Sequence, residues 1–126
     1  MTPERVLDIS FQYVTDGEAL RRAVQELSRE RALGFDTETT ELDPYKGELR
    51  LVQLSNGKDT YVIDLRRFEN ASASESVAPL RELLGDPAVT KVAHNAKFDM
   101  KWVRHHLGVE INGVFDTYLA SLLIAA

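Results

Sequence analysis

The chain has 126 residues, of which 44% are hydrophobic, and this length and composition suit a single globular domain with one core. Its 20 acidic side chains outnumber its 15 basic ones, so the molecule as a whole is not drawn to a polyanion and any nucleic acid must be held locally. The lack of cysteine excludes disulfides and thiolate zinc sites and favours a cytoplasmic protein, and no apolar run resembles a signal peptide or membrane span.

The N-terminal part of the chain predicts a strand followed by a helix. Phe11 to Val14 is a short run of strand formers, and Thr15 to Glu18 has the form of a capping box that opens a helix. Apolar residues then recur at helical spacing, which predicts a face that packs inward: Leu20, Ala23, Val24 and Leu27.

The next apolar stretch predicts an interior strand that ends in two acids. Leu33 and Phe35 are followed by Asp36 and Glu38, and residues two apart in a strand point to the same face. Two adjacent carboxylates repel each other unless a cation lies between them, and hard oxygen ligands suit Mg²⁺ or Mn²⁺. The alternative is a pair of solvated acids at the end of a strand.

A hairpin is predicted after this strand. Turn residues make Asp43 to Gly47 a loop, and Leu49 to Ser55 then forms a strand. Asn56-Gly57 marks a tight turn, after which Thr60 to Leu65 is expected to pair antiparallel with the strand before it.

A helix and a parallel strand are expected to follow. Ser72 and Glu75 have the spacing of a second capping box, Gly85 is able to supply a left-handed stop, and Pro87 prevents continuation. The apolar face of this helix consists of Val77, Leu80, Leu83 and Leu84. Lys91 to Ala93 is a brief strand, and a strand after a helix after a strand indicates a parallel crossover.

A further helix is predicted from a cap at Asn95 to Leu107, with Gly108 as its stop. Asp99 lies one turn into this helix, so its carboxylate is able to meet Asp36 and Glu38 at the carboxyl edge of the sheet, where α/β folds bind ligands. In the alternative interpretation, Asp99 only complements the helix dipole. The same helix carries basic side chains on one side, which either steer a phosphate backbone or form an ordinary solvated face: Lys97, Lys101, Arg104 and His105.

The last helix is expected from Tyr118 onward, after a short apolar stretch around Val114-Phe115, and Asp116 is readily explained as its cap. Its apolar residues run on without a stop signal: Leu119, Leu122, Leu123 and Ile124. We therefore expect either a second copy of the chain, giving a homo-oligomer, or a missing C-terminal segment to cover this helix.

Four segments, taken together and in order, resemble the DEDD superfamily of 3′-5′ exonucleases, above all ribonuclease D and the proofreading domain of family A DNA polymerases. They are Gly-Phe-Asp-Thr-Glu-Thr-Thr-Glu-Leu-Asp-Pro from Gly34, Leu-Val-Gln-Leu-Ser from Leu51, His-Asn-Ala-Lys-Phe-Asp from His94, and Phe-Asp-Thr from Phe115. The resemblance implies a single α/β domain over residues 1–126 with a ribonuclease H-like mixed sheet, in which three antiparallel strands are extended by parallel ones and flanked by helices.

The resemblance also implies a site with two divalent metal ions, Mg²⁺ or Mn²⁺, acting on the 3′ end of single-stranded RNA or DNA. Asp36 matches the acid that bridges both metals, Glu38 the ligand of the metal that carries the attacking water, and Asp99 the anchor of the other metal. Four further positions match contacts to the substrate, although Leu42, an apolar wedge against a base, has simple core packing as its alternative: Thr39, Leu42, Asn95 and Phe98.

The family's fourth motif, a Tyr or His followed four residues later by Asp, has no match, since Tyr118 is followed by Leu122. The expectation is therefore an incomplete exonuclease domain that is slow by itself. Two other hypotheses stay open: a non-catalytic nucleic-acid-binding or regulatory remnant, and an oligomeric nuclease of very short oligoribonucleotides. The metal chemistry acts on a phosphodiester without reading the 2′-hydroxyl, so RNA and DNA are not distinguished.

Overall fold

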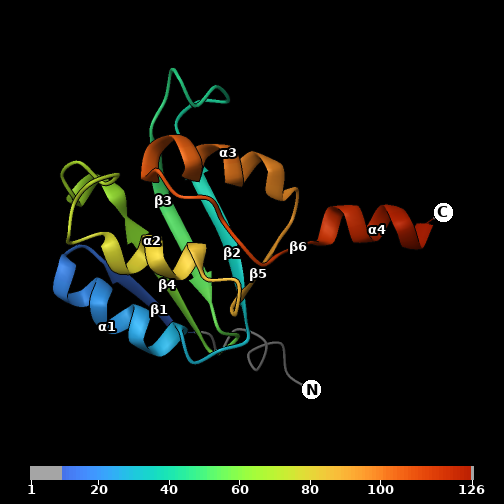
Figure 1. The fold of residues 1–126 in the computed structure, drawn as a ribbon, viewed down its shortest axis with the longest axis horizontal. Helices are drawn as coiled ribbons and strands as arrows, with labels where there is room; N and C mark the ends of the chain where they lie inside the picture. Colours follow the sequence, from blue (N-terminus) through green and yellow to red (C-terminus); the bar gives the residue numbers. More distant parts are fainter. Residues whose placement is uncertain (1–9, 126) are drawn as a thin grey trace.

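The computed structural model describes residues 10–125. Its centre is a six-stranded sheet with the strand order β1-β4-β3-β2-β5-β6 (Figure 1). The strands are β1 (Ser10–Val14), β2 (Ala32–Thr39), β3 (Leu49–Ser55), β4 (Asp59–Asp64), β5 (Thr90–Ala93) and β6 (Val114–Asp116).

The sheet is mixed. β2, β3 and β4 pair antiparallel, while β5 and β6 extend the β2 edge in parallel and β1 extends the β4 edge in parallel. This arrangement confirms the predicted ribonuclease H-like sheet. The Asn56-Gly57 hairpin is also confirmed, since Gly57 takes a φ of 87° that favours glycine.

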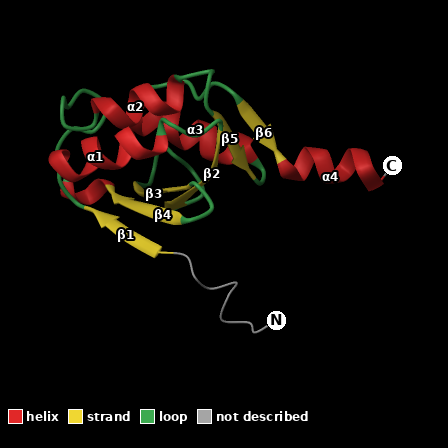
Figure 2. Ribbon diagram, turned by 90° about the horizontal axis from the view of Figure 1, so that it is seen from below, coloured by secondary structure: helices red, strands yellow, loops and turns green. Residues whose placement is uncertain are grey.

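Three helices cover one face of the sheet, namely α1 (Gly17–Leu27), α2 (Ala78–Gly85) and α3 (Ala96–Leu107) (Figure 2). A short 3₁₀ turn, η2 (Leu65–Arg67), follows β4. The core lies between these helices and the sheet, and Leu20, Leu54 and Trp102 are among its fully buried side chains. In contrast, α4 (Thr117–Ala125) projects away from the body of the domain. Within residues 10–125, no helix is long and apolar enough to cross a membrane.

Several predicted helix ends are wrong in detail. The cap of α1 is Asp16, whose side chain accepts a hydrogen bond from the Ala19 N–H, and not Thr15. Ser72 and Glu75 do not cap α2, because that helix starts after Val77 without any side-chain cap. Gly85 stays helical and supplies no left-handed stop, so α2 ends at Gly85 and the following Asp86 has extended backbone.

The other face of the sheet, which we call the open face, is not covered by α1, α2 or α3 (Figure 2). One row of paired residues crosses all six strands on this face: Phe11, Thr60, Ser55, Gly34, Val92 and Phe115. The aromatic residues at the two ends of the row are 66% and 52% exposed, respectively. An apolar surface of this kind is typical of a face that something else covers.

Candidate active site

The two acids of β2 lie on the open face. Leu33 and Phe35 are buried beneath the helices, whereas Gly34, Asp36 and Glu38 are exposed, as the alternation along a strand requires. A register shift between Glu38 and Thr39 ends the regular pairing with β3. The two carboxylates therefore stand side by side at the end of β2, which is also what the alternative of two solvated acids requires.

Asp99 approaches the same end of β2 from the first turn of α3. It is only 4% exposed, and its carboxylate accepts a hydrogen bond from the hydroxyl of Thr37, the residue between Asp36 and Glu38. Burial raises the pKa of Asp99 to about 6, the hydrogen bond from Thr37 opposes this rise, and the negative charges of Asp36 and Asp116 add to it. This depth of burial exceeds what a surface acid that merely complements the helix dipole would need.

The chemistry of these three acids fits a hard divalent cation. All three present carboxylate oxygens, and none of them takes part in the four ion pairs found within the described chain. However, residues 10–125 contain no group of three or more His, Asp or Glu side chains gathered closely enough to hold a metal. The assignment of Asp36, Glu38 and Asp99 as metal ligands therefore stays a prediction.

Asp116 caps two helices at once. Its carboxylate accepts hydrogen bonds from the Asn95 and Ala96 N–H groups at 2.9 Å, where α3 begins, and from the Tyr118 N–H at 2.9 Å, where α4 begins. Desolvation acts to raise the pKa of Asp116, but these N–H donors and that of Leu119 outweigh it and lower the pKa. Asn95 holds the N-cap position of α3 as predicted, but the expected capping by its side chain is wrong, because that side chain makes no such bond and the backbone is left-handed, with a φ of 58°.

The four predicted substrate contacts occupy different positions around this end of β2. Thr39 donates its hydroxyl to the Glu41 carbonyl, Asn95 is exposed at the start of α3, and Phe98 packs half-buried beside Trp102. Leu42 is 86% exposed in the loop after β2, so its alternative as a core residue is wrong.

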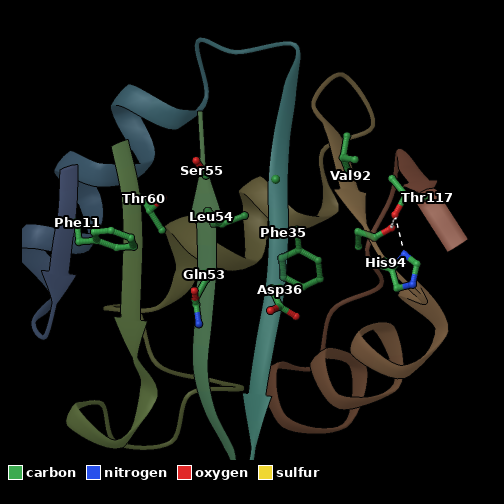
Figure 3. Close-up of a pocket in the computed structure, with 12 residues that line it drawn as sticks. Phe11, Phe35, Asp36, Gln53, Leu54, Ser55, Thr60, Val92, His94 and Thr117 are labelled. Carbon is green, nitrogen blue, oxygen red and sulfur yellow. Dashed lines mark hydrogen bonds between the residues drawn. The ribbon is translucent and has the colours of Figure 1, made fainter. Parts of the chain in front are cut away.

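A hollow of about 460 Å³ lies on the open face next to Asp36 (Figure 3). Gly34 and His94 are among the residues that line it, and the Nδ1 atom of His94 lies 3.0 Å from the Thr117 hydroxyl. Sequence reasoning did not single out Gln53, although it pairs with Asp36 across the sheet and lines the same hollow. The alternation along β3 was the available signal, because it places Gln53 on the same face as Asp36 once the hairpin register is known.

The loop between β2 and β3 is fixed to α3. At its base, the Glu48 N–H donates to the Thr40 hydroxyl at 2.8 Å, and a Cβ on Gly47 would lie 2.7 Å from the Cβ of Glu41. At its tip, His106 Nε2 donates to the Pro44 carbonyl at 2.9 Å. The turn residues indicated a loop here, but nothing in the local pattern predicted that it docks on a helix 62 residues away in the chain.

Replacing Asp99 with asparagine is expected to stabilise the metal-free protein at pH 8 by roughly a few degrees in Tm. When folding raises the pKa of a carboxyl group, its ionised form destabilises the folded protein. This destabilisation is complete above the folded pKa, here about 6, and is absent below the ordinary pKa of an aspartate. The gain should therefore shrink as the pH falls through 6 toward 4, as measured by thermal unfolding in a chelator.

Asp116→Asn provides a control of opposite sign, because the lowered pKa of Asp116 means that its ionised form stabilises the fold at neutral pH. It should melt below wild type at pH 8, and its deficit should shrink at acidic pH. Equal melting of wild type and Asp99→Asn at pH 8 would contradict the burial cost assigned to the Asp99 carboxylate.

Comparison with known proteins places this geometry in context. Residues 11–126 match the model of a family described as 3′-5′ exonuclease. The chain is 36% identical over 116 residues to DNA polymerase I of Aquifex aeolicus, a match that covers 92% of this chain and 18% of the polymerase. Among solved structures, Escherichia coli RNase D, an exoribonuclease involved in structured RNA processing, has a TM-score of 0.73 at 26% identity and is matched over 86% of this chain and 27% of its own.

NrnC of Brucella melitensis, solved with bound Mg²⁺, is also similar. Its TM-score is 0.70 at 29% identity, over 91% of this chain and 52% of NrnC. The 126 residues thus span about a fifth of the polymerase and about half of the NrnC chain.

Proposed function

This chain belongs to the 3′-5′ exonuclease family, and from that membership we propose that it hydrolyses phosphodiester bonds at the 3′ end of single-stranded nucleic acid with the help of two divalent metal ions. The observation that carries the proposal is the approach of Asp99, buried and joined to Thr37, to the end of β2 that bears Asp36 and Glu38. The bound Mg²⁺ in NrnC supports the choice of metal.

Each acid has a distinct part in this proposal. Asp36 and Glu38 would hold metal from the open face, and Asp99 would hold it from the first turn of α3. When bound, divalent ions supply a nucleophilic water at neutral pH and offset the charge that develops on the leaving 3′-oxygen. Burial first, and the nearby negative charges of Asp36 and Asp116 second, raise the pKa of Asp99, and a cation there would favour the ionised carboxylate.

The terminal nucleotide would lie beside the acids. Thr39 would reach it from the end of β2, Leu42 from the loop after β2, and Asn95 and Phe98 from the start of α3. Leu42 suits a wedge against a base, because a leucine that is 86% exposed has no packing role in the free protein. Neither RNA nor DNA is favoured by these groups, and both are substrates to be tried.

A single-stranded oligonucleotide with a 5′ label is expected to be shortened stepwise from its 3′ end in Mn²⁺, and chelation should stop the reaction. The chain contains matches to three of the family's four acids, so we expect a rate at least about a hundredfold below that of a relative with all four. Gel electrophoresis of timed samples gives the measurement, with RNA and DNA oligomers of one sequence compared directly.

A 5′ phosphorothioate block is the control, since it should leave the products unchanged. Products that begin from the 5′ end or from internal cleavage would contradict the proposal. Metal binding without turnover would favour the non-catalytic remnant instead.

We also propose that α4 and the part of the open face around β1 are covered by a partner surface, either a second copy of this chain or another segment of a longer protein. Apolar side chains on α4 are highly exposed, including Leu123 at 80% and Ile124 at 87%. The open face exposes Phe11 and Tyr13, at 66% and 74%, and so offers a complementary apolar surface.

A further inference from the structure

A second hollow, of about 480 Å³, lies between the β2–β3 loop and the outer face of α3. Its lining residues, which we call the Tyr45 pocket, are Pro44, Tyr45, Lys101, Arg104 and His105. None of these residues is used by the catalytic proposal above. The pocket combines an aromatic ring with cationic side chains, although the net charge of the chain is −5.

The ring of Tyr45 is presented to solvent on a fixed support. It is 82% exposed, and it meets the His105 ring edge-on with the centroids 4.5 Å apart. The Tyr45 N–H donates to Asp43 Oδ1 at 2.9 Å. The carbonyl of the preceding Pro44 accepts a hydrogen bond from His106, and the His106 ring stacks on the buried Trp102 with the ring centroids 5.2 Å apart. Because these contacts already hold the loop in place, binding of a ligand on Tyr45 would cost little entropy for ordering the loop.

The cations of the pocket are available for an anion. Lys101 is exposed and takes part in none of the ion pairs found in residues 10–125. Arg104 pairs with Glu110 at 3.1 Å, but both side chains are more than half exposed, and such pairs contribute little. A phosphate is therefore able to compete with Glu110 for Arg104.

The position of the pocket relates it to the acids. Lys101 and Arg104 follow Asp99 on the same helix by two and five residues, and at 1.5 Å per residue Arg104 lies about 8 Å further along the helix axis. The loop connects the same two places, since it follows directly on β2, the strand that bears Asp36 and Glu38, and carries Tyr45 at the pocket. A strand whose 3′ end lies at Asp99 thus has an aromatic and basic surface within a few nucleotides of that end.

We propose that the Tyr45 pocket binds a nucleotide of the single-stranded substrate on the 5′ side of the bond that is cut, with a base stacked on Tyr45 and a phosphate held by Lys101 and Arg104. The proposal rests on the proposed function and adds a second contact for the same strand. Stacking on one ring accepts any base, so the pocket favours longer strands without favouring a sequence.

The test compares binding of a 5′-fluorescein eight-nucleotide strand and a 5′-fluorescein dinucleotide by fluorescence anisotropy, in a chelator that prevents hydrolysis. Tyr45→Leu is expected to weaken binding of the eight-mer about fivefold or more and to leave the dinucleotide unchanged. Lys101→Gln should also weaken the eight-mer and should lower the slope of log affinity against log salt by about 0.7. Tyr45→Phe, which keeps the ring, should bind as wild type does.

A matched variant controls for the loss of an exposed charge elsewhere. Lys58→Gln removes an exposed charge in the β3–β4 turn and should bind both oligomers as wild type does. If Tyr45→Leu and Lys101→Gln bind the eight-mer as wild type does, or lose both oligomers equally, the pocket proposal is overturned. If wild type shortens strands but Tyr45→Leu and Lys101→Gln bind the eight-mer normally, only the pocket proposal is overturned. If wild type neither binds nor shortens the strands, the proposed function is overturned as well.

Discussion

Alanine in place of Asp36 is expected to abolish Mn²⁺ binding and to lower any exonuclease rate by at least about a hundredfold. Asp36 stands on the open face beside Glu38, and its charge reaches Asp99, whose pKa it helps to raise. Removing it takes away one hard oxygen ligand and part of the negative potential that attracts a cation. Isothermal titration with Mn²⁺ at pH 8 measures the binding independently of turnover.

Glu30→Ala is the matched control, because this exposed acid precedes β2 at the end opposite to Asp36. It should bind Mn²⁺ as wild type does. Equal Mn²⁺ binding by wild type and Asp36→Ala would contradict a metal site at this end of β2. A further check is acidity, since binding should weaken as the pH falls below about 6, where Asp99 becomes protonated.

Wild-type protein is expected to self-associate at micromolar concentrations. The Leu119→Glu and Leu123→Glu variants are each expected to be monomeric. Both leucines are exposed on α4, at 57% and 80%. Burying one leucine side chain is worth about 1.5–3 kcal/mol, so several on each of two copies would offset the entropy lost on pairing. A glutamate at either position would have to be buried as an unpaired charge, which is far more costly. Sedimentation velocity over a range of concentrations measures the effect.

Leu42→Glu serves as the control, since Leu42 is 86% exposed but lies in the β2–β3 loop, outside α4 and outside the strands of the sheet. It should associate as wild type does. A wild type that stays monomeric at high micromolar concentration would rule out the second copy and leave another segment of a longer protein as the cover for α4.

Single strands and the hairpin could be predicted from the sequence because their signals are local, whereas the mixed sheet as a whole was expected from the family resemblance. Alternation at Leu33, Phe35, Asp36 and Glu38 fixes which side chains share a face, and the Asn56-Gly57 turn fixes the pairing of β3 with β4. The burial of α2 along Leu80, Leu83 and Leu84 follows from helical spacing in the same way.

The features that could not be predicted depend on contacts between residues far apart in the chain, or on which of two neighbouring residues with similar capping preferences caps a helix. Thr15 and Asp16 are both good caps one residue apart, and local pattern does not decide between them. The capping of α3 by Asp116 joins residues 20 and 21 positions apart, so it becomes visible only once β5 and β6 lie side by side. The same is true of the contact between Thr37 and Asp99.

The shared cap at Asp116 links the two helices energetically. Its carboxylate accepts hydrogen bonds from the N–H groups at the start of α3 and at the start of α4, so a change at α4 that displaces this carboxylate would also disturb the start of the helix that carries Asp99. A molecule that binds α4 and displaces the Asp116 carboxylate is therefore expected to change the affinity for a ligand at Asp99. By thermodynamic reciprocity, that ligand changes the affinity for the molecule at α4 by the same factor.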